Sequence, residues 1–141
     1  MADKMTRKVG RRGILMVLAV AGCLLVACGS SPSAAQQVCS DRANLKSAMT
    51  TVVEKVRQGN FTAAKNDVPA VKDALNSLRQ SAKNLQSQQA QALQPQVDTL
   101  KSTLANLGNA TSLSELRTGL ESASSQVQSI SDEIVSTLNC S

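Results

Sequence analysis

Apolar residues recur at every third or fourth position between 112 and 138, and no other regularity in the chain limits its possible folds so strongly. This spacing is the period of an α-helix that buries one face. Ser112 and Glu115 have the spacing of a capping box, which marks a helix start. The pattern predicts a helix over about 112–138 that packs against other helices. Its apolar positions are Leu113, Leu116, Leu120, Ala123, Val127, Ile130, Ile134 and Leu138.

Three earlier segments carry shorter stripes of the same period, which together predict an all-α fold. The first, at about 41–58, follows Ser40 as its predicted N-cap. The second, at about 68–90, has Pro69 in its first turn, where a missing N–H is tolerated. The third is expected at about 95–107. Their apolar positions are Leu45, Met49, Val52 and Val56, then Val71, Leu75, Leu78, Ala82 and Leu85, then Val97, Leu100, Leu104 and Leu107.

Pro95 leaves two architectures open at this point. It either kinks one long helix that runs from Pro69 to Leu107, or it opens a separate third helix. The stretch 86–96 contains six Gln residues, which we interpret as a solvated helix end or a linker. If a turn separates two helices here, we expect it at about 91–94.

The composition is almost free of aromatic and imidazole side chains. The chain of 141 residues has no His, Trp or Tyr, and its one Phe is Phe61. The core must therefore be aliphatic, and no aromatic platform is available on which nucleic-acid bases or sugars could stack. Without His, most metal sites and most pairs of a nucleophile with a base are also excluded.

The sequence also lacks the common catalytic motifs. It has no Gly-rich phosphate loop, no Cys-x-x-Cys and no Ser in a nucleophile elbow. Asp132 and Glu133 are adjacent, so on a helix they point to different faces and make a poor acid–base pair. We therefore expect no catalytic residues, no metal and no cofactor, and we expect that the protein is not an enzyme.

The N-terminal segment has the layout of a signal peptide. Positions 1–13 carry five basic residues and one acid, and the next 14 residues, 14–27, carry no charge. An apolar run of this length is shorter than the roughly 20 residues that a helix needs to cross a bilayer. We therefore expect a removable signal sequence rather than a permanent membrane span.

This apolar run closes with Leu25-Val26-Ala27-Cys28. The four residues resemble the lipobox of bacterial lipoproteins, which consists of an aliphatic residue, a small or branched residue, Gly, Ala or Ser, and then Cys. The resemblance covers the first 31 residues. It implies that the Cys28 thiol receives a diacylglyceryl group and that a peptidase cuts just before it. An ordinary signal peptide with a chance Cys is the alternative.

The resemblance implies a chain of three parts: a signal peptide at 1–27, a flexible tether at 28–38 and a helical bundle domain at 39–141. The protein would be exported and held by lipid on the outer face of the bacterial cell membrane, or on the outer membrane of a Gram-negative cell. The mature part is loosely similar to small actinobacterial lipoproteins that have a Cys before the first helix and another after the last. That likeness implies no activity.

The mature chain is nearly neutral. The whole chain has a net charge of +5, but five of its 15 basic residues and one of its 10 acids precede Cys28. The remaining net charge near +1 gives no basic patch for nucleic acid. The expected partners are the membrane, through lipidated Cys28, and a protein of the cell envelope.

Two of the four cysteines remain available for a disulfide. By the resemblance, Cys23 would leave with the signal peptide and Cys28 would carry lipid. Export would place Cys39 and Cys140 in an oxidising compartment, where two thiols are more often paired than free. A Cys39–Cys140 disulfide is therefore expected, and a free pair or an intermolecular bridge is the alternative.

The expected disulfide also limits the number of helices. Cys39 lies just before the first predicted helix and Cys140 just after the last, so in an up-down bundle they meet only if the number of helices is even. Three helices would leave them tens of ångströms apart, beyond the roughly 7 Å between Cα atoms that a disulfide spans. We therefore predict an antiparallel up-down bundle of four helices, with Pro95 opening the third. An oligomeric coiled coil is less favoured, because turn signals interrupt the pattern.

Two functions are compatible with these features. The first is a non-enzymatic interaction or structural module of the cell envelope. The alternative is a lipoprotein that binds a lipid or another hydrophobic small molecule between its helices. A bundle filled by Leu, Val and Ile, with no internal cavity above about 300 Å³, would remove the basis for the alternative. A groove lined by Leu75, Leu78, Leu100 and Leu104 would support it.

Lipidation of Cys28 predicts the behaviour of a Cys28→Ala variant. We expect an unprocessed or soluble product, because two or three acyl chains at about 0.8 kcal/mol per buried methylene are needed for stable anchoring. Phase partitioning in detergent checks this. A variant that partitions into the detergent phase as the parent does would refute the lipidation.

Overall fold

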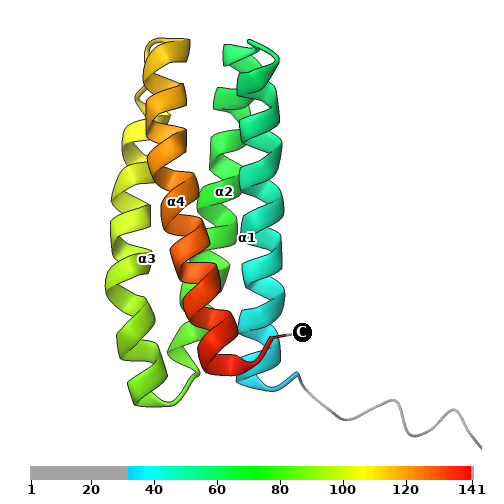
Figure 1. Ribbon diagram of the computed structural model, residues 1–141, viewed down its shortest axis with the longest axis vertical. Helices are drawn as coiled ribbons and strands as arrows, with labels where there is room; N and C mark the ends of the chain where they lie inside the picture. Colours follow the sequence, from blue (N-terminus) through cyan, green and yellow to red (C-terminus); the bar gives the residue numbers. More distant parts are fainter. Residues whose placement is uncertain (1–31, 141) are drawn as a thin grey trace, which may run out of the picture. The chain divides into compact units, whose positions relative to one another are not determined.

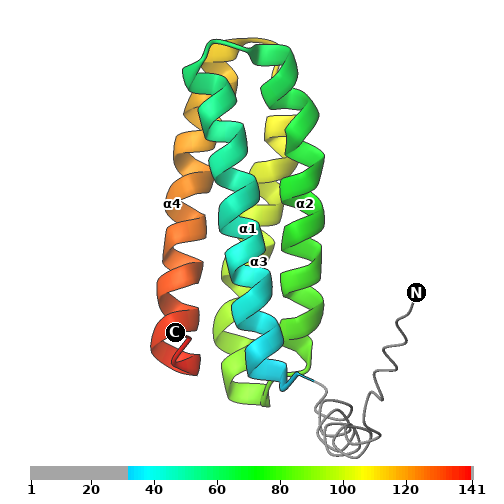
Figure 2. The same cartoon turned by 90° about the vertical axis from the view of Figure 1, so that its right-hand side faces the viewer.

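The computed structural model describes residues 32–140, and this part of the chain contains four α-helices and no strand. The helices are α1 (Ala34–Arg57), α2 (Phe61–Lys83), α3 (Ser87–Gly108) and α4 (Leu113–Leu138). They run up and down in alternation (Figure 1). In the view turned by 90°, α1 lies between α4 and α2 with α3 behind it (Figure 2). The predicted all-α, four-helix bundle is confirmed. The predicted signal peptide, Cys23 and Cys28 lie outside the described residues.

The core is aliphatic, as the composition predicts. Each helix turns one stripe of Leu, Val, Ile, Met or Ala inward, and burying one large side chain of this kind contributes about 1.5–3 kcal/mol. Phe61 is partly buried and packs against the core at the start of α2. Among the described residues only Val135, at 37% exposure, is a large exposed apolar residue. The apolar stripes are therefore closed within one chain. The largest fully buried side chains include Leu45, Leu78, Leu93, Leu100, Leu104, Leu116, Ile130 and Ile134.

Helix α1 begins at Ala34, so the prediction of a start near 41 with Ser40 as N-cap is wrong. Ser33 is the N-cap, and its hydroxyl accepts a hydrogen bond from the backbone N–H of Gln36. The Gln36 side chain accepts one from the Ser33 N–H in return, which completes a capping box. Val38, two turns before Leu45, is fully buried. The predicted flexible tether therefore becomes helix from Ala34 onward.

Pro69 and Pro95 lie inside helices, although the sequence favours a helix start at each. Each is the ninth residue of its helix. An interior Pro removes a backbone hydrogen bond and costs about 3 kcal/mol, which is why a start is the expected reading of each. Burial of apolar side chains on both sides offsets that cost here. These side chains are Val68 and Val71 around Pro69, and Leu93 and Val97 around Pro95.

The turn between α2 and α3 lies at 84–86 and not at the predicted 91–94. The Gln-rich stretch is therefore mostly part of α3, which is anchored to the core by Leu93. Because α2 begins at Phe61, with Asn60 as its N-cap, the four helices have 24, 23, 22 and 26 residues. Because the helices are nearly equal in length, their ends lie at the same two levels and short turns can connect them.

The predicted disulfide joins Cys39 to Cys140, with 5.7 Å between the two Cα atoms. Cys39 is the sixth residue of α1 rather than a residue before it. Asn139 has a left-handed backbone with φ of 52°, and its N–H bonds to the Val135 carbonyl. This cap ends α4 and returns the chain toward α1. The expectation that an even number of helices brings the two cysteines together is thereby confirmed. We call this end of the bundle the disulfide end.

The start of α4 uses the predicted residues in a different arrangement. The Ser112 hydroxyl accepts a hydrogen bond from the Glu115 N–H at 3.2 Å, which is one half of a capping box. The Glu115 carboxylate accepts from the backbone N–H and the hydroxyl of Thr111, at 2.8 and 2.9 Å. These bonds, the backbone one first, hold the pKa of Glu115 below its ordinary value of 4.5. The reciprocal bond to Ser112 that a full capping box requires is thus replaced by a bond to the preceding residue.

Replacing both Cys39 and Cys140 by Ser should lower the free energy of unfolding by about 2–4 kcal/mol, because the cross-link removes entropy from the unfolded chain. Denaturant unfolding with and without a reductant measures this. The reductant should destabilise the parent by a similar amount and leave the double variant unchanged. Two thiols that alkylate in the native, unreduced protein would contradict the disulfide.

Glu115→Gln should lower the melting temperature at pH 7 but not at strongly acidic pH. The folded pKa of Glu115 is below its unfolded value, so its stabilisation is present above 4.5 and is lost as the pH falls through the folded pKa. Thermal unfolding across this range checks the effect. The matched control is Glu121→Gln, an exposed carboxylate of the same helix. A parent and a Glu115→Gln variant that melt alike at every pH would contradict the role of this carboxylate.

Candidate functional site

The predicted site residues do not form a reactive centre in the described part of the chain. Cys39 and Cys140 are joined to each other, and Cys28 lies outside the described residues. Asp132 is exposed and accepts a hydrogen bond from Gln128 of its own helix. Within residues 32–140 no three His, Cys, Asp or Glu side chains come together as metal ligands would. None of the helices in this range has the length and apolar content to cross a bilayer.

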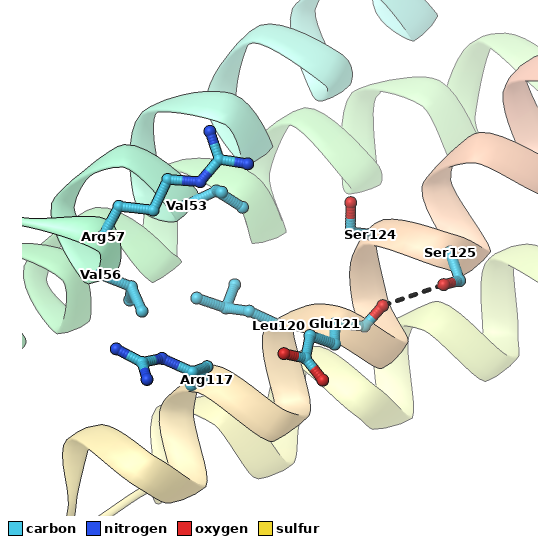
Figure 3. A pocket seen from close by; sticks show the side chains of 8 residues that line it. All are labelled: Val53, Val56, Arg57, Arg117, Leu120, Glu121, Ser124 and Ser125. Atoms are coloured by element: carbon cyan, nitrogen blue, oxygen red, sulfur yellow. Dashed lines mark hydrogen bonds between the residues drawn. The ribbon is translucent and has the colours of Figure 1, made fainter.

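The bundle surface is concave at the seam between α1 and α4. Two depressions there, of about 400 and about 210 Å³, share Val53, Arg57 and Ser124, so we treat them as one feature and call it the α1–α4 groove. Val53 and Val56 from α1 and Leu120 from α4 project into the space between the helices (Figure 3). The groove extends from the middle of the bundle to the end opposite the disulfide.

Two guanidinium groups border the α1–α4 groove. Arg57 and Arg117 are both exposed and come from the last turn of α1 and the second turn of α4. Arg79 and Asp98, 3.5 Å apart, form the one ion pair among residues 32–140. Arg57 and Arg117 are therefore free of carboxylate partners within this range, although Glu121 borders the same depression. Both cations are available to an acidic group from outside.

The floor of the groove offers little apolar surface. Met49, Val56, Leu120 and Val127 are between 3 and 5% exposed, and only Val53 is half-buried. At about 25 cal/mol per Å² of apolar surface removed from water, an acyl chain laid on this floor would gain little. The groove is therefore suited to single side chains of a protein partner rather than to an enclosed lipid.

The leucines expected around a carrier cavity are core residues instead. Leu75, Leu78, Leu100 and Leu104 are at most 2% exposed. None of them lines the α1–α4 groove, the polar pocket described next or a shallow depression of about 450 Å³ beside the turn between α3 and α4. The structure thus brings these four side chains together as packing and not as the wall of a cavity.

A second concave surface, which the sequence does not predict, lies between α1 and α2 near the disulfide end. This polar pocket has a volume of about 600 Å³. Asp41, at the start of the first predicted helix, belongs to this pocket and is largely buried. The spacing from Val38 through Asp41 to Leu45 places this carboxylate on the buried stripe, and that signal could have found it. Its lining residues are Gln37, Asp41, Asn76, Ser77, Gln80, Ser81, Lys83 and Asn84.

Comparisons with protein-family models, with curated proteins and with solved structures found nothing that matches this chain.

Proposed function

We propose that the protein is an exported lipoprotein, held at the outer face of a bacterial membrane by Cys28, whose helical bundle is a non-enzymatic module for contact with another envelope protein. The observation that carries this proposal is the Cys39–Cys140 disulfide. Paired thiols persist in oxidising compartments outside the cytoplasm and are rare inside it. The lipobox-like sequence 25–28 supports the same compartment independently.

The chain length between the proposed anchor and the bundle supports a position close to the membrane. Only residues 29–33 separate Cys28 from the first residue of α1. Six residue steps at 3.3–3.6 Å reach about 22 Å at most. Helix α1, at about 1.5 Å per residue, extends about 36 Å from its start. The end of α1 that carries Arg57 is therefore about 36 Å from the first residue of this helix.

The α1–α4 groove is the surface that we assign to the protein partner. It combines the half-buried Val53 with Arg57 and Arg117, which have no carboxylate partner within residues 32–140. This chemistry fits a partner segment that offers an apolar side chain next to carboxylates. A contact area of this small size is typical of a transient interface rather than an obligate one.

The alternative of a lipid carrier has less support. The four leucines expected around its cavity are packed in the core. The α1–α4 groove and the polar pocket are surface depressions open to solvent, and neither encloses an apolar ligand. A carrier of this kind would have to open the bundle, which exposes core side chains at a cost of about 1.5–3 kcal/mol each.

Site-specific photo-crosslinking in intact cells tests the partner contact. A photoreactive residue replaces Ser124, which is exposed beside the α1–α4 groove, or Ser102, which is exposed on α3 and serves as the matched control. We expect a discrete adduct of higher mass from position 124 and none from position 102. Charge reversal at Arg117 to Glu should weaken the adduct. The same adducts from both positions, or none from either, would contradict the assigned surface.

A further inference from the structure

The polar pocket contains a carboxylate that the bundle itself only partly satisfies. Asp41 is 6% exposed, and its Oδ1 accepts one hydrogen bond, from the Gln37 side chain at 3.3 Å. The one ion pair within residues 32–140 is elsewhere, between Arg79 and Asp98. A carboxylate has about four acceptor sites, and a largely buried one is costly to leave without hydrogen-bond partners. The other acceptor sites of Asp41 make no hydrogen bond within residues 32–140, and because Asp41 lines the pocket they are available to a group that binds there.

The rest of the pocket wall is rich in neutral groups that both donate and accept hydrogen bonds. The one negative charge, on Asp41, is balanced by the one positive charge, on Lys83. The Ser81 hydroxyl donates to the Leu78 carbonyl, which leaves its oxygen as an acceptor. Helix α1 contributes one edge of this wall and the last turns of α2 contribute the other. The neutral groups are the carboxamides of Gln37, Asn76, Gln80 and Asn84 and the hydroxyls of Ser77 and Ser81.

We propose that the polar pocket binds a saccharide or a similar ring with neighbouring hydroxyl groups. Each ligand hydroxyl both donates and accepts, so it can use the carboxamides and serines in both directions. Two adjacent hydroxyls can donate together to the Asp41 carboxylate, and charge-assisted bonds of this kind are the strong ones. A volume of about 600 Å³ accommodates one or two sugar rings.

Other ligand classes fit this wall less well. A metal ion would find one carboxylate, and within the described residues no acidic or thiol cluster gathers around it. A simple anion would meet Asp41, and a simple cation would meet Lys83. Because no aromatic ring lines the pocket, a saccharide would be held by hydrogen bonds without stacking. We therefore expect a dissociation constant on the order of 1 mM for a single sugar.

The ligand could be a free saccharide or the sugar headgroup of a glycolipid. The pocket lies near the disulfide end, where α1 begins and the chain leads back toward Cys28. Only the glycolipid source depends on the proposed membrane anchor. The hydrogen-bonding chemistry of the wall is the same for both sources.

Amide chemical shifts of the isotope-labelled full-length protein, titrated with D-glucose and with maltose, test the proposal. We expect saturable shifts at Asn76, Ser77 and Gln80. Asp41→Asn should weaken binding about tenfold or more, because one hydrogen bond to a charged group is lost. Asp132→Asn is the matched control, since Asp132 also accepts one bond from a Gln four residues earlier but is exposed and outside the pocket. It should bind within about twofold of the parent.

Three results of this titration would overturn the proposal. If neither sugar gives saturable shifts, if the shifts map outside the pocket, or if Asp41→Asn binds as the parent does, the proposal is overturned. If Asp41→Asn does not fold, Gln80→Ala decides instead, because Gln80 is exposed and its carboxamide lines the pocket. An equal affinity of that variant and the parent would then overturn the proposal.

Vesicles distinguish the two sources of the sugar. Phosphatidylcholine vesicles with and without a glucosyl diacylglycerol are added to the same protein. A lipid-anchored chain would join both kinds, so only a response confined to the glycolipid vesicles assigns the headgroup. If the protein purified from cell membranes responds to free sugar, the pocket is supported. If that protein carries no lipid at Cys28, the proposed anchor is contradicted, whatever the pocket binds.

Discussion

Burial of one aliphatic stripe from each of four helices is the constraint on which the rest of this structure depends. The chain has a single aromatic residue, so the core is built from aliphatic side chains. In a four-helix bundle such side chains pack ridges into grooves between helices that cross at a small angle. Each helix packs against more than one neighbour, and the arrangement of α1 to α4 around a shared core buries all four stripes (Figures 1 and 2). The polar faces are left outside.

The ends of the chain are held by a second constraint that the first makes possible. Four antiparallel helices return the end of α4 to the start of α1, and the left-handed Asn139 turns Cys140 toward Cys39. The cross-link encloses almost the whole bundle, because 101 positions separate the two cysteines. Such a cross-link contributes a large share of the free energy of unfolding in a small domain whose core has no large aromatic side chains.

The helical type of each segment could be predicted from its apolar spacing, and the number of helices from the expected disulfide, which requires an even count in an up-down bundle. Their boundaries could not. Both Pro69 and Pro95 have the sequence signature of a helix start, and only the packing around them shows that tertiary contacts outweigh it. The start of α1 was marked by Ser33 and Gln36, a capping box with a Gln in place of Glu. The spacing from Val38 to Leu45 could have shown that Asp41 is buried, but not that it lines a pocket, because the pattern does not show what lies opposite it on α2.

The central claim is that this bundle is an exported domain with lipid at Cys28 and a disulfide between Cys39 and Cys140. Intact-mass and peptide mass spectrometry of the unreduced protein, purified from the membranes of cells that express it, tests both parts at once. The account predicts a chain that starts at Cys28 with acyl chains attached, and one peptide in which Cys39 and Cys140 are linked. A chain that still begins at Met1, with no lipid and with both thiols free, would contradict it.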